Sequence, residues 1–185
     1  MLENDIREVL FSEEQIRERI KALAGQISKE YEGVEGEIYC VGMLKGAAIF
    51  FADLVRAISL PVKFDFIIAS SYGNCAESSG SVEIKKDFSY GVEGKHLILI
   101  EDIVDSGITM HYLLDYLRRK NPASLKLCAL MDKASRRKEK VEIDYCGFEV
   151  SDEFLVGYGL DYAGRYRNLP YVGILKREIY EKEDA

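Results

Sequence analysis

The stretch that decides the fold is Leu97-Ile-Leu-Ile-Glu-Asp-Ile-Val-Asp-Ser-Gly-Ile-Thr109. Its uninterrupted apolar start is typical of a central strand in a parallel sheet that is covered on both faces. Two adjacent carboxylates, Glu101 and Asp102, follow at the carboxyl end of that strand, where open α/β sheets bind their ligands. The next five residues lead into a helix, so their backbone N–H groups and hydroxyls can surround a phosphate group. The segment therefore predicts a monophosphate site made of Asp105, Ser106, Gly107, Ile108 and Thr109.

This turn is neither a Walker loop nor a dinucleotide-binding turn, because the sequence has no G-x-x-x-x-G-K-[ST] and no G-x-G-x-x-G. Taken alone, it could equally be a polar turn in which Asp105 or Ser106 caps the helix. The two carboxylates on a core strand favour the phosphate site. A receiver-like acidic pocket is the competing interpretation, but it needs an acidic pair on the first strand, and residues 38–41 carry none.

Strands and helices alternate through the middle of the chain, which predicts an α/β fold with a mainly parallel, twisted sheet flanked by helices. A capping box at Ser12 predicts a first helix that runs to Gly33. Residues 70–80 are rich in turn formers and predict a mobile loop. We expect further strands at 38–41, 62–68, 81–86, 97–100, 125–131, 154–156 and 171–175, and helices near 50–58 and 110–117.

Composition limits the class of protein. The chain has 185 residues, 48% of them hydrophobic, and a formal net charge of −7. This length fits one domain with a sizeable core, and the negative charge argues against nonspecific nucleic-acid binding. The four cysteines form no C-x-x-C pair. The longest apolar run is interrupted by Asp53 and Arg56, and the acidic start resembles no secretory signal, so we expect a cytoplasmic protein without a membrane span.

Several segments of the sequence resemble a known family. The segment Glu101–Thr109 looks like the phosphoribosyl pyrophosphate motif of the type I phosphoribosyltransferases. Further segments resemble the 6-oxopurine branch of that family, the hypoxanthine-guanine phosphoribosyltransferases. They are Val41-Gly-Met-Leu-Lys-Gly46, Ser70-Ser-Tyr-Gly73, Val156-Gly-Tyr-Gly-Leu-Asp-Tyr162 and Arg165-Tyr-Arg-Asn-Leu-Pro-Tyr171. Ala134 and Ser151 depart from bacterial relatives, which often have proline at these positions.

The resemblance implies a fold and a reaction. The fold is a single domain, 1–185, with a small hood lobe formed by residues 150–185 and part of the N-terminus. The reaction transfers a 5-phosphoribosyl group from phosphoribosyl pyrophosphate to a purine, with Mg²⁺ on the leaving pyrophosphate. Hypoxanthine, and guanine with it, are the implied acceptors.

The resemblance also implies roles for the residues around the phosphate loop. Glu101 and Asp102 would bind the ribose hydroxyls, directly or through Mg²⁺, because carboxylates accept hydrogen bonds and attract hard cations. Asp105 would be the catalytic residue near purine N7. Asp161 would complete a second magnesium site, although an isolated aspartate could instead cap a turn.

Three other groups of residues are implied in binding. Lys45, Gly46 and Arg167 would bind pyrophosphate, and relatives often have a cis peptide at the position of Leu44-Lys45. For the purine, Lys133 would contact O6, Phe154 would stack on the base, and the backbone of Leu155 would contact its edge. Ser71 and Tyr72 would belong to a mobile loop that closes over the reacting centre. Considered without the family, Phe154 would be a core aromatic, and Lys133 would be a solvated lysine in a basic run.

Other interpretations stay open from the sequence. One is a regulator that keeps this fold and binds nucleic acid, which would need a basic face and tends to lose the purine-pocket residues. Another is a sibling transferase that prefers xanthine or adenine and differs only in the pocket. The resemblance also implies a homodimer or homotetramer, with small-molecule substrates and neither nucleic acid nor membrane as a partner.

Overall fold

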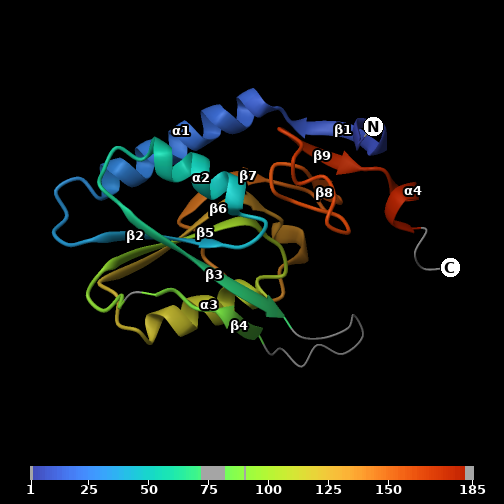
Figure 1. The fold of residues 1–185 in the computed structure, drawn as a ribbon. Helices are drawn as coiled ribbons and strands as arrows, with labels where there is room; N and C mark the ends of the chain where they lie inside the picture. Colours follow the sequence, from blue (N-terminus) through green and yellow to red (C-terminus); the bar gives the residue numbers. More distant parts are fainter. Residues whose placement is uncertain (1, 72–81, 90, 182–185) are drawn as a thin grey trace.

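The computed structural model describes residues 2–71, 82–89 and 91–181. Most of the elements belong to one six-stranded sheet and the helices around it (Figure 1). The strands are β1 (Ile6–Phe11), β2 (Ile38–Met43), β3 (Lys63–Ser71), β4 (Val82–Lys86), β5 (His96–Val104), β6 (Ser124–Asp132), β7 (Tyr145–Glu149), β8 (Leu155–Val156) and β9 (Val172–Leu175). The helices are α1 (Glu13–Glu30), α2 (Ala48–Ala57), α3 (Ile108–Arg118) and α4 (Arg177–Tyr180), with short 3₁₀ turns at Leu2–Asp5 and Ala134–Arg136.

The large sheet has the strand order β4-β3-β2-β5-β6-β7. Its strands run parallel except β4, which is antiparallel to β3. Helices α1 and α2 lie over one face of this sheet and α3 lies over the other (Figure 1). The predicted fold class is therefore confirmed, and the edge strand β4 is the return strand expected after the loop.

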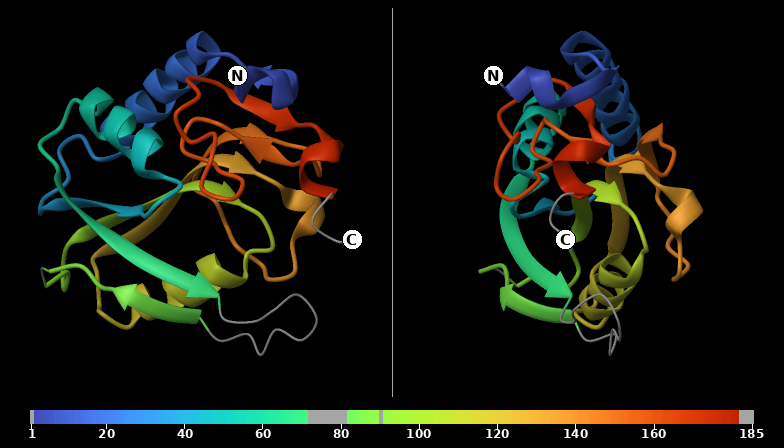
Figure 2. Two further views of the ribbon diagram at one scale, coloured as in Figure 1. Left: turned by 45° about the vertical axis from the view of Figure 1, so that its right-hand side comes forward. Right: turned by 90° about the vertical axis from the view of Figure 1, so that its right-hand side faces the viewer.

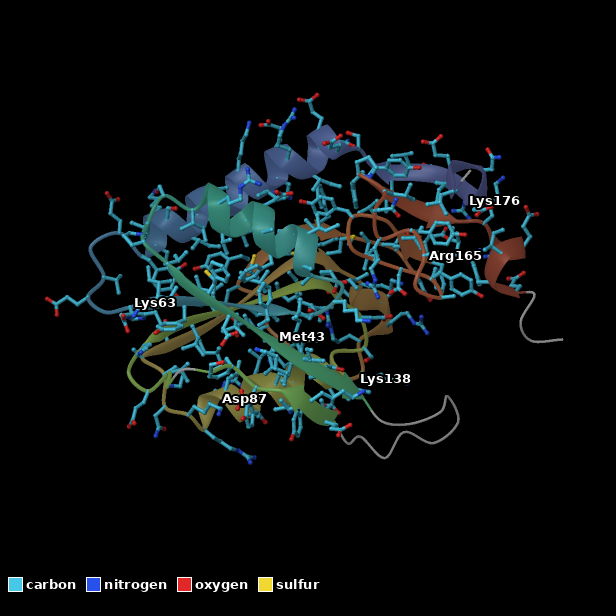
Figure 3. The ribbon with its side chains drawn as sticks, viewed as in Figure 1. Met43, Lys63, Asp87, Lys138, Arg165 and Lys176 are labelled. Atoms are coloured by element: carbon cyan, nitrogen blue, oxygen red, sulfur yellow. The ribbon has the colours of Figure 1, made fainter. Side chains whose placement is uncertain are left out.

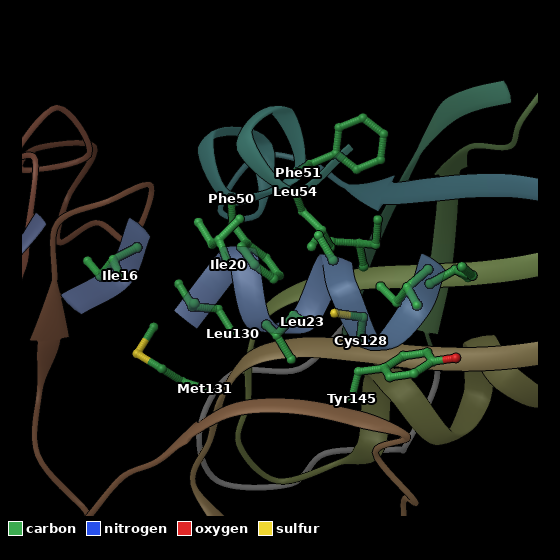
Figure 4. Close-up of a cluster of buried hydrophobic side chains, with 14 of the residues drawn as sticks. Ile16, Ile20, Leu23, Phe50, Phe51, Leu54, Cys128, Leu130, Met131 and Tyr145 are labelled. Carbon is green, nitrogen blue, oxygen red and sulfur yellow. The ribbon is translucent and has the colours of Figure 1, made fainter. Parts of the chain in front are cut away.

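Strand β5 is the centre of the core, as its apolar run predicts. Leu97 and Leu99 point toward α3, whereas Ile98 and Ile100 point toward α1 and α2, and all four are fully buried. Figure 4 shows the α1 and α2 side of this core, where Ile20 and Leu23 of α1 lie next to Phe50 and Leu54 of α2. Because successive residues of a strand point to opposite faces, the two carboxylates that follow are also directed to opposite sides of the sheet.

A second, three-stranded sheet has the order β1-β9-β8 and is called the small sheet below. Strand β1 comes from the N-terminal segment, whereas β8 and β9 come from the C-terminal segment, so the two ends of the chain meet in it (Figure 2). The sequence pattern does not indicate β1, because Arg7 and Glu8 interrupt its apolar residues. Strand β7 was not predicted either. It is a short edge strand that pairs, among the described strands, with β6 alone, and its own residues show no clear apolar pattern.

The ends of several elements differ slightly from the prediction. The capping box is confirmed: Ser12 Oγ accepts a hydrogen bond from the Gln15 N–H, and Gln15 Oε1 accepts one from the Ser12 N–H. Helix α1 ends at Glu30, three residues before Gly33. Among the described cysteines, Cys40, Cys128 and Cys146 are free thiols. None of the described helices has the length and apolar character needed to cross a membrane.

Candidate active site

A cavity of about 300 Å³ opens at the carboxyl ends of β2, β3 and β5. It lies at the edge of the sheet where the sequence predicts a ligand. Figure 3 shows one of its lining residues, Met43, near the centre of the molecule where β2 ends. The lining residues are Met43, Ala69, Glu101, Ile103, Val104, Asp105, Ser106, Gly107, Thr109 and Met110.

The phosphate loop, defined as Asp105–Thr109, turns directly into α3. Gly107 is the N-cap residue and has φ +82°, a backbone conformation that glycine adopts without strain. No side chain caps the helix, and the Ile108 N–H only reaches Ser106 Oγ at 3.5 Å. A helix start leaves its first N–H groups without intrahelical partners, so these donors are free to bind a phosphate in the cavity. Among the described residues, the long contact with Ser106 Oγ is the one side-chain contact of these N–H groups, so the geometry favours a phosphate site over a turn that is capped by Asp105 or Ser106.

Residues 137–139 pack against this loop and form hydrogen bonds with it. The N–H groups of Lys138 and Glu139 donate to the Ser106 carbonyl at 2.8 and 3.1 Å. A Cβ on Gly107 would lie 2.6 Å from the Glu139 carbonyl oxygen and 3.0 Å from Cδ of Arg137. Arg137, which also donates to Asp132, was not singled out from the sequence, where it is one residue of a basic run. The close packing fixes the loop and leaves no space for a larger residue at Gly107.

The two carboxylates are buried in different parts of the site. Glu101 is 8% exposed and lines the cavity, whereas Asp102 is 9% exposed and points toward Gly46. Burial raises the pKa of Glu101 well above its usual value, and the neighbouring Asp102 charge raises it further. Burial also raises the pKa of Asp102 to about 6. Neither has an ion-pair partner within 4.0 Å among the described residues, which is costly for a buried charge and indicates a site for a positive group.

Asp102 lies where the turn after β2 meets the C-terminal segment. A Cβ on Gly46 would lie 1.8 Å from Asp102 Oδ2, and a Cβ on Gly159 would lie 2.1 Å from the Gly46 carbonyl oxygen. The Leu44-Lys45 peptide before this turn is cis. Gly159, which no local sequence pattern indicates, is thus required by the close approach of two backbones.

Arg167 joins the same group of residues. Its Nη1 donates to the Gly159 carbonyl at 2.6 Å, and its Nη2 lies 2.5 Å from Asp161 Oδ1. Arg167 lowers the pKa of Asp102, and Asp161 raises it, although burial is the larger cause. The structure therefore brings together Gly46, Asp102, Asp161 and Arg167, which come from three separate segments of the sequence.

The carboxylates fit a divalent cation, although they do not form a closed metal site. No group of three or more metal-ligating side chains lies close enough to hold an ion among residues 2–71, 82–89 and 91–181. Glu101 and Asp102 are buried acceptors, and neither forms an ion pair with a described side chain. Mg²⁺ is bound in proteins by one or two carboxylates together with substrate phosphates and waters. The donor set is thus suited to a magnesium ion that arrives with a phosphorylated substrate.

The proposed purine contacts lie near the start of β8. Lys133 is only 6% exposed, and its Nζ donates to the Glu153 carbonyl at 2.8 Å. It is therefore a buried lysine, although the surrounding basic run favoured a solvated one. Asp105 lies 3.8 Å from the Arg136 guanidinium, and both side chains are partly exposed.

The backbone of Leu155 lies at an open strand edge. The Leu175 N–H donates to the Phe154 carbonyl at 2.8 Å, and Leu155 faces Ile174 in the register of β8 and β9. Hydrogen-bonded and non-hydrogen-bonded pairs alternate along an antiparallel ladder, so Leu155 belongs to a non-hydrogen-bonded pair. Its N–H and C=O point away from β9, at the edge of the small sheet, where they can meet a planar base.

The predicted loop residues are only partly described. Ser71 is the last residue of β3, where its backbone pairs with Val82 of β4. Tyr72 and the rest of the predicted loop, to residue 81, lie outside the described residues.

The fold and the site together define a class of protein. The carboxyl edge of a parallel sheet carries a cavity lined by a helix start and the buried Glu101. Beside Gly46 lies the second buried carboxylate, Asp102, in the group that includes Arg167. These features are suited to a phosphorylated sugar with a second anionic group. The class is that of α/β proteins that bind sugar phosphates, to which the phosphoribosyltransferases belong.

Comparisons with known proteins identify the family. Residues 9–163 match the phosphoribosyl transferase domain. The chain is 48% identical over 181 residues to a hypoxanthine-guanine phosphoribosyltransferase of Bacillus subtilis (strain 168), which covers 98% of this chain and 99% of the relative. It is 46% identical over 182 residues to the protein of that name from Streptococcus thermophilus (strain CNRZ 1066), covering 98% and 100%. The chain therefore belongs to the phosphoribosyltransferase family, and the resemblance stated from the motifs is confirmed.

Solved structures agree with this result. The fold is similar to that of a hypoxanthine phosphoribosyltransferase from Staphylococcus aureus, with a TM-score of 0.93, 44% identity and coverage of 97% of this chain and 96% of that one. It is also similar to a hypoxanthine-guanine phosphoribosyltransferase from Bacillus anthracis, with a TM-score of 0.87, 47% identity and coverage of 92% and 99%. The predicted type I phosphoribosyltransferase fold is thus confirmed.

Proposed function

We propose that this chain is a purine salvage enzyme that transfers the 5-phosphoribosyl group of phosphoribosyl pyrophosphate to hypoxanthine and guanine. The products are IMP or GMP and pyrophosphate. The observation that carries the proposal is the buried Lys133, which joins two parts of the site. Its Nζ donates to the Glu153 carbonyl, two residues before the open edge at Leu155, and its N–H donates to the Val104 carbonyl, directly before the phosphate loop. Close relatives named for this reaction match the chain over nearly its full length, which supports the same assignment.

The phosphate loop would hold the 5-phosphate. Free N–H groups at the start of α3 and the hydroxyls of Ser106 and Thr109 surround the cavity, and the helix dipole favours a dianion there. Glu101 and Asp102 would accept hydrogen bonds from the ribose hydroxyls. A bound Mg²⁺ would supply positive charge to the leaving pyrophosphate. Glu101 and Asp102 would hold this ion, and Asp161 would help to hold a second one.

In the transfer step, a purine nitrogen forms a bond to C1 of the ribose while the bond from C1 to the pyrophosphate oxygen breaks. The electron pair of the broken bond leaves with pyrophosphate. Asp105, which lines the cavity beside the phosphate loop, would accept the proton that the purine loses, at N7. Lys45, the Gly46 backbone and Arg167 would bind the departing pyrophosphate, because a planar guanidinium fits phosphate oxygens.

Selection of the base would depend on Lys133. An ammonium group only donates hydrogen bonds, so it favours the 6-oxo group of hypoxanthine or guanine over the 6-amino group of adenine. Besides its bond to the Glu153 carbonyl, the ammonium has further donors, and the wrong base would leave one of them unpaired. Sites of this kind discriminate by about 10⁴. Phe154 would stack on the base, and the Leu155 backbone would contact its edge. Ser71 and Tyr72 would belong to the loop that excludes water during transfer.

The nucleic-acid-binding regulator is less well supported. The only concentrated basic run of this sequence is residues 133–140. Two of its cationic side chains are not available on an open basic surface. Arg137 donates to Asp132, and Lys133 is buried and so is not part of an exposed basic face. We propose a single-domain enzyme of the cytoplasm, with the small sheet as its hood, that acts as a homodimer or homotetramer on small molecules.

The test is an ultraviolet assay of the purified protein with phosphoribosyl pyrophosphate, Mg²⁺ and each of four bases. We expect turnover of hypoxanthine and guanine and at least a thousandfold lower kcat/KM for adenine. Xanthine as the best acceptor would favour the sibling enzyme. Absence of turnover with every 6-oxopurine would refute the proposal.

A further inference from the structure

The ring of Phe154 is held by two tyrosines from different parts of the chain. Tyr180, the last residue of α4, stacks on it with the ring centroids 4.8 Å apart and the planes at 22°. Tyr162 meets it at 89°, with the centroids 5.4 Å apart. Both distances and angles fall among the favourable aromatic geometries, offset stacking in the first pair and edge-to-face contact in the second.

The segment that carries Tyr180 is fixed to the N-terminal segment. The Lys176 N–H donates to the Asp5 carbonyl at 2.9 Å, and Lys176 Nζ donates to the Asn4 carbonyl at 2.6 Å. Figure 3 shows Lys176 beside the N-terminal end of β1. Tyr166 Oη donates to Asp5 Oδ2 at 2.8 Å, which ties the same turn to the C-terminal loop. Tyr180 therefore belongs to a segment that is held in place, and it packs against the apolar cluster that contains Val156 of β8 and Leu175 of β9.

The backbone at Phe154 is fixed separately from its ring. The Phe154 carbonyl accepts from the Leu175 N–H, and Glu153 forms an ion pair with Arg7 at 2.7 Å. These contacts set the position of β8, but they do not set the torsions of the Phe154 side chain. The plane of that ring is set by what packs against it, and Tyr180 provides the parallel contact.

We propose that Tyr180 is a positioning residue for the purine, because it holds the Phe154 ring in the plane on which the base stacks. This inference rests on the proposed function, in which Phe154 stacks on the base. Ordering a free side chain on binding weakens affinity, and a ring that is already held avoids that loss. Aromatic pairs of this kind contribute enough that their loss corresponds to about a two- to tenfold change in binding.

The test compares steady-state constants of Tyr180→Ala, Tyr180→Leu and Tyr180→Phe with those of the wild type. We expect Y180A and Y180L to raise the KM for hypoxanthine about two- to tenfold, with the KM for phosphoribosyl pyrophosphate unchanged within twofold. Y180F keeps the stacked ring and should restore the wild-type KM. Y180L keeps most of the apolar volume, so it reports on the ring even if the alanine variant folds poorly.

Phe154→Ala serves as the reference variant. If F154A raises the KM for hypoxanthine and neither Y180A nor Y180L does, the inference about Tyr180 is wrong while the proposed function stands. A lower KM for hypoxanthine in Y180A would also overturn it, because Tyr180 would then compete with the base. If F154A itself leaves that KM unchanged, the stacking role in the proposed function is wrong. Equal increases in the KM values of both substrates would show a general structural effect and refute the positioning role.

Discussion

The contact between Gly46 and Asp102 gives the sharpest prediction, which is the effect of Gly46→Ala. The added Cβ would lie 1.8 Å from Asp102 Oδ2 and 2.7 Å from Asp102 Cγ. Ordinary contact would require a displacement of about 1.6 Å. Asp102 cannot move freely, because its carboxylate is buried and accepts a hydrogen bond from the Ile103 N–H at 2.9 Å. Either the carboxylate or the turn at residues 45–46 must shift.

Such a shift would affect stability and activity together. Overpacking a core costs about 1–3 kcal/mol, which for a chain of this size lowers Tm by several degrees. A misplacement of about 1 Å in a catalytic site can cost about 10²-fold in rate, so we expect kcat/KM for phosphoribosyl pyrophosphate to fall about 100-fold or more. Initial rates with hypoxanthine, at varied phosphoribosyl pyrophosphate, measure this directly.

Gly25→Ala is the matched control. Gly25 lies within α1 and has no atom within 4 Å of its Cβ position, so alanine there should raise stability by up to about 1 kcal/mol and leave the rates unchanged. If G46A keeps kcat/KM within threefold of the wild type while remaining folded, the close contact of Gly46 with Asp102 is not part of the working site.

Three further predictions concern single side chains of the site. Asp105→Asn should lower kcat about 10²- to 10⁴-fold with nearly normal nucleotide binding, measured by steady-state kinetics and IMP titration; an unchanged kcat would remove Asp105 from catalysis. Lys133→Ala should raise the KM for hypoxanthine at least tenfold, because a charged hydrogen bond is lost, and Lys138→Ala is its control; equal KM values would refute the contact with O6. Asp102→Asn tests the raised pKa of about 6. This pKa is higher than the pKa of an aspartate in the unfolded chain, so ionisation of Asp102 destabilises the folded state as the pH rises. The loss of folding free energy is about 3 kcal/mol between pH values below 4 and above 6, and about 1 kcal/mol of that loss occurs between pH 5 and pH 8. In metal-free buffer the Tm of D102N relative to wild type should therefore be higher at pH 8 than at pH 5, and a constant difference would contradict the shift.

Much of the large sheet could be predicted from local sequence. The apolar run of β5 identifies a strand buried on both faces, and the capping box at Ser12 identifies the start of α1. These signals work because the deciding interactions lie within a few residues of each other. The turn into α3 at Asp105–Thr109 was predicted for the same reason, and its binding of a phosphate stays a prediction.

The small sheet and the group around Asp102 could not be predicted from such local signals. Strand β1 is stabilised by pairing with β9, which lies more than 150 residues further along the chain. The need for glycine at position 159 follows only from the fold, in which a Cβ on that residue would lie 2.1 Å from the Gly46 carbonyl oxygen. Lys133 likewise reads as a surface lysine, and its burial depends on the Glu153 carbonyl that it meets in the fold. The family resemblance indicated Lys133, and local chemistry alone did not.

The measurement that tests the central claim most directly is product analysis of one reaction mixture that contains the protein, hypoxanthine, phosphoribosyl pyrophosphate and Mg²⁺. Chromatography would quantify IMP, and an enzymatic assay would quantify pyrophosphate. We predict equal amounts of the two products, formed only when all components are present. Release of pyrophosphate without IMP, or absence of both products, would contradict the assignment of this site to phosphoribosyl transfer.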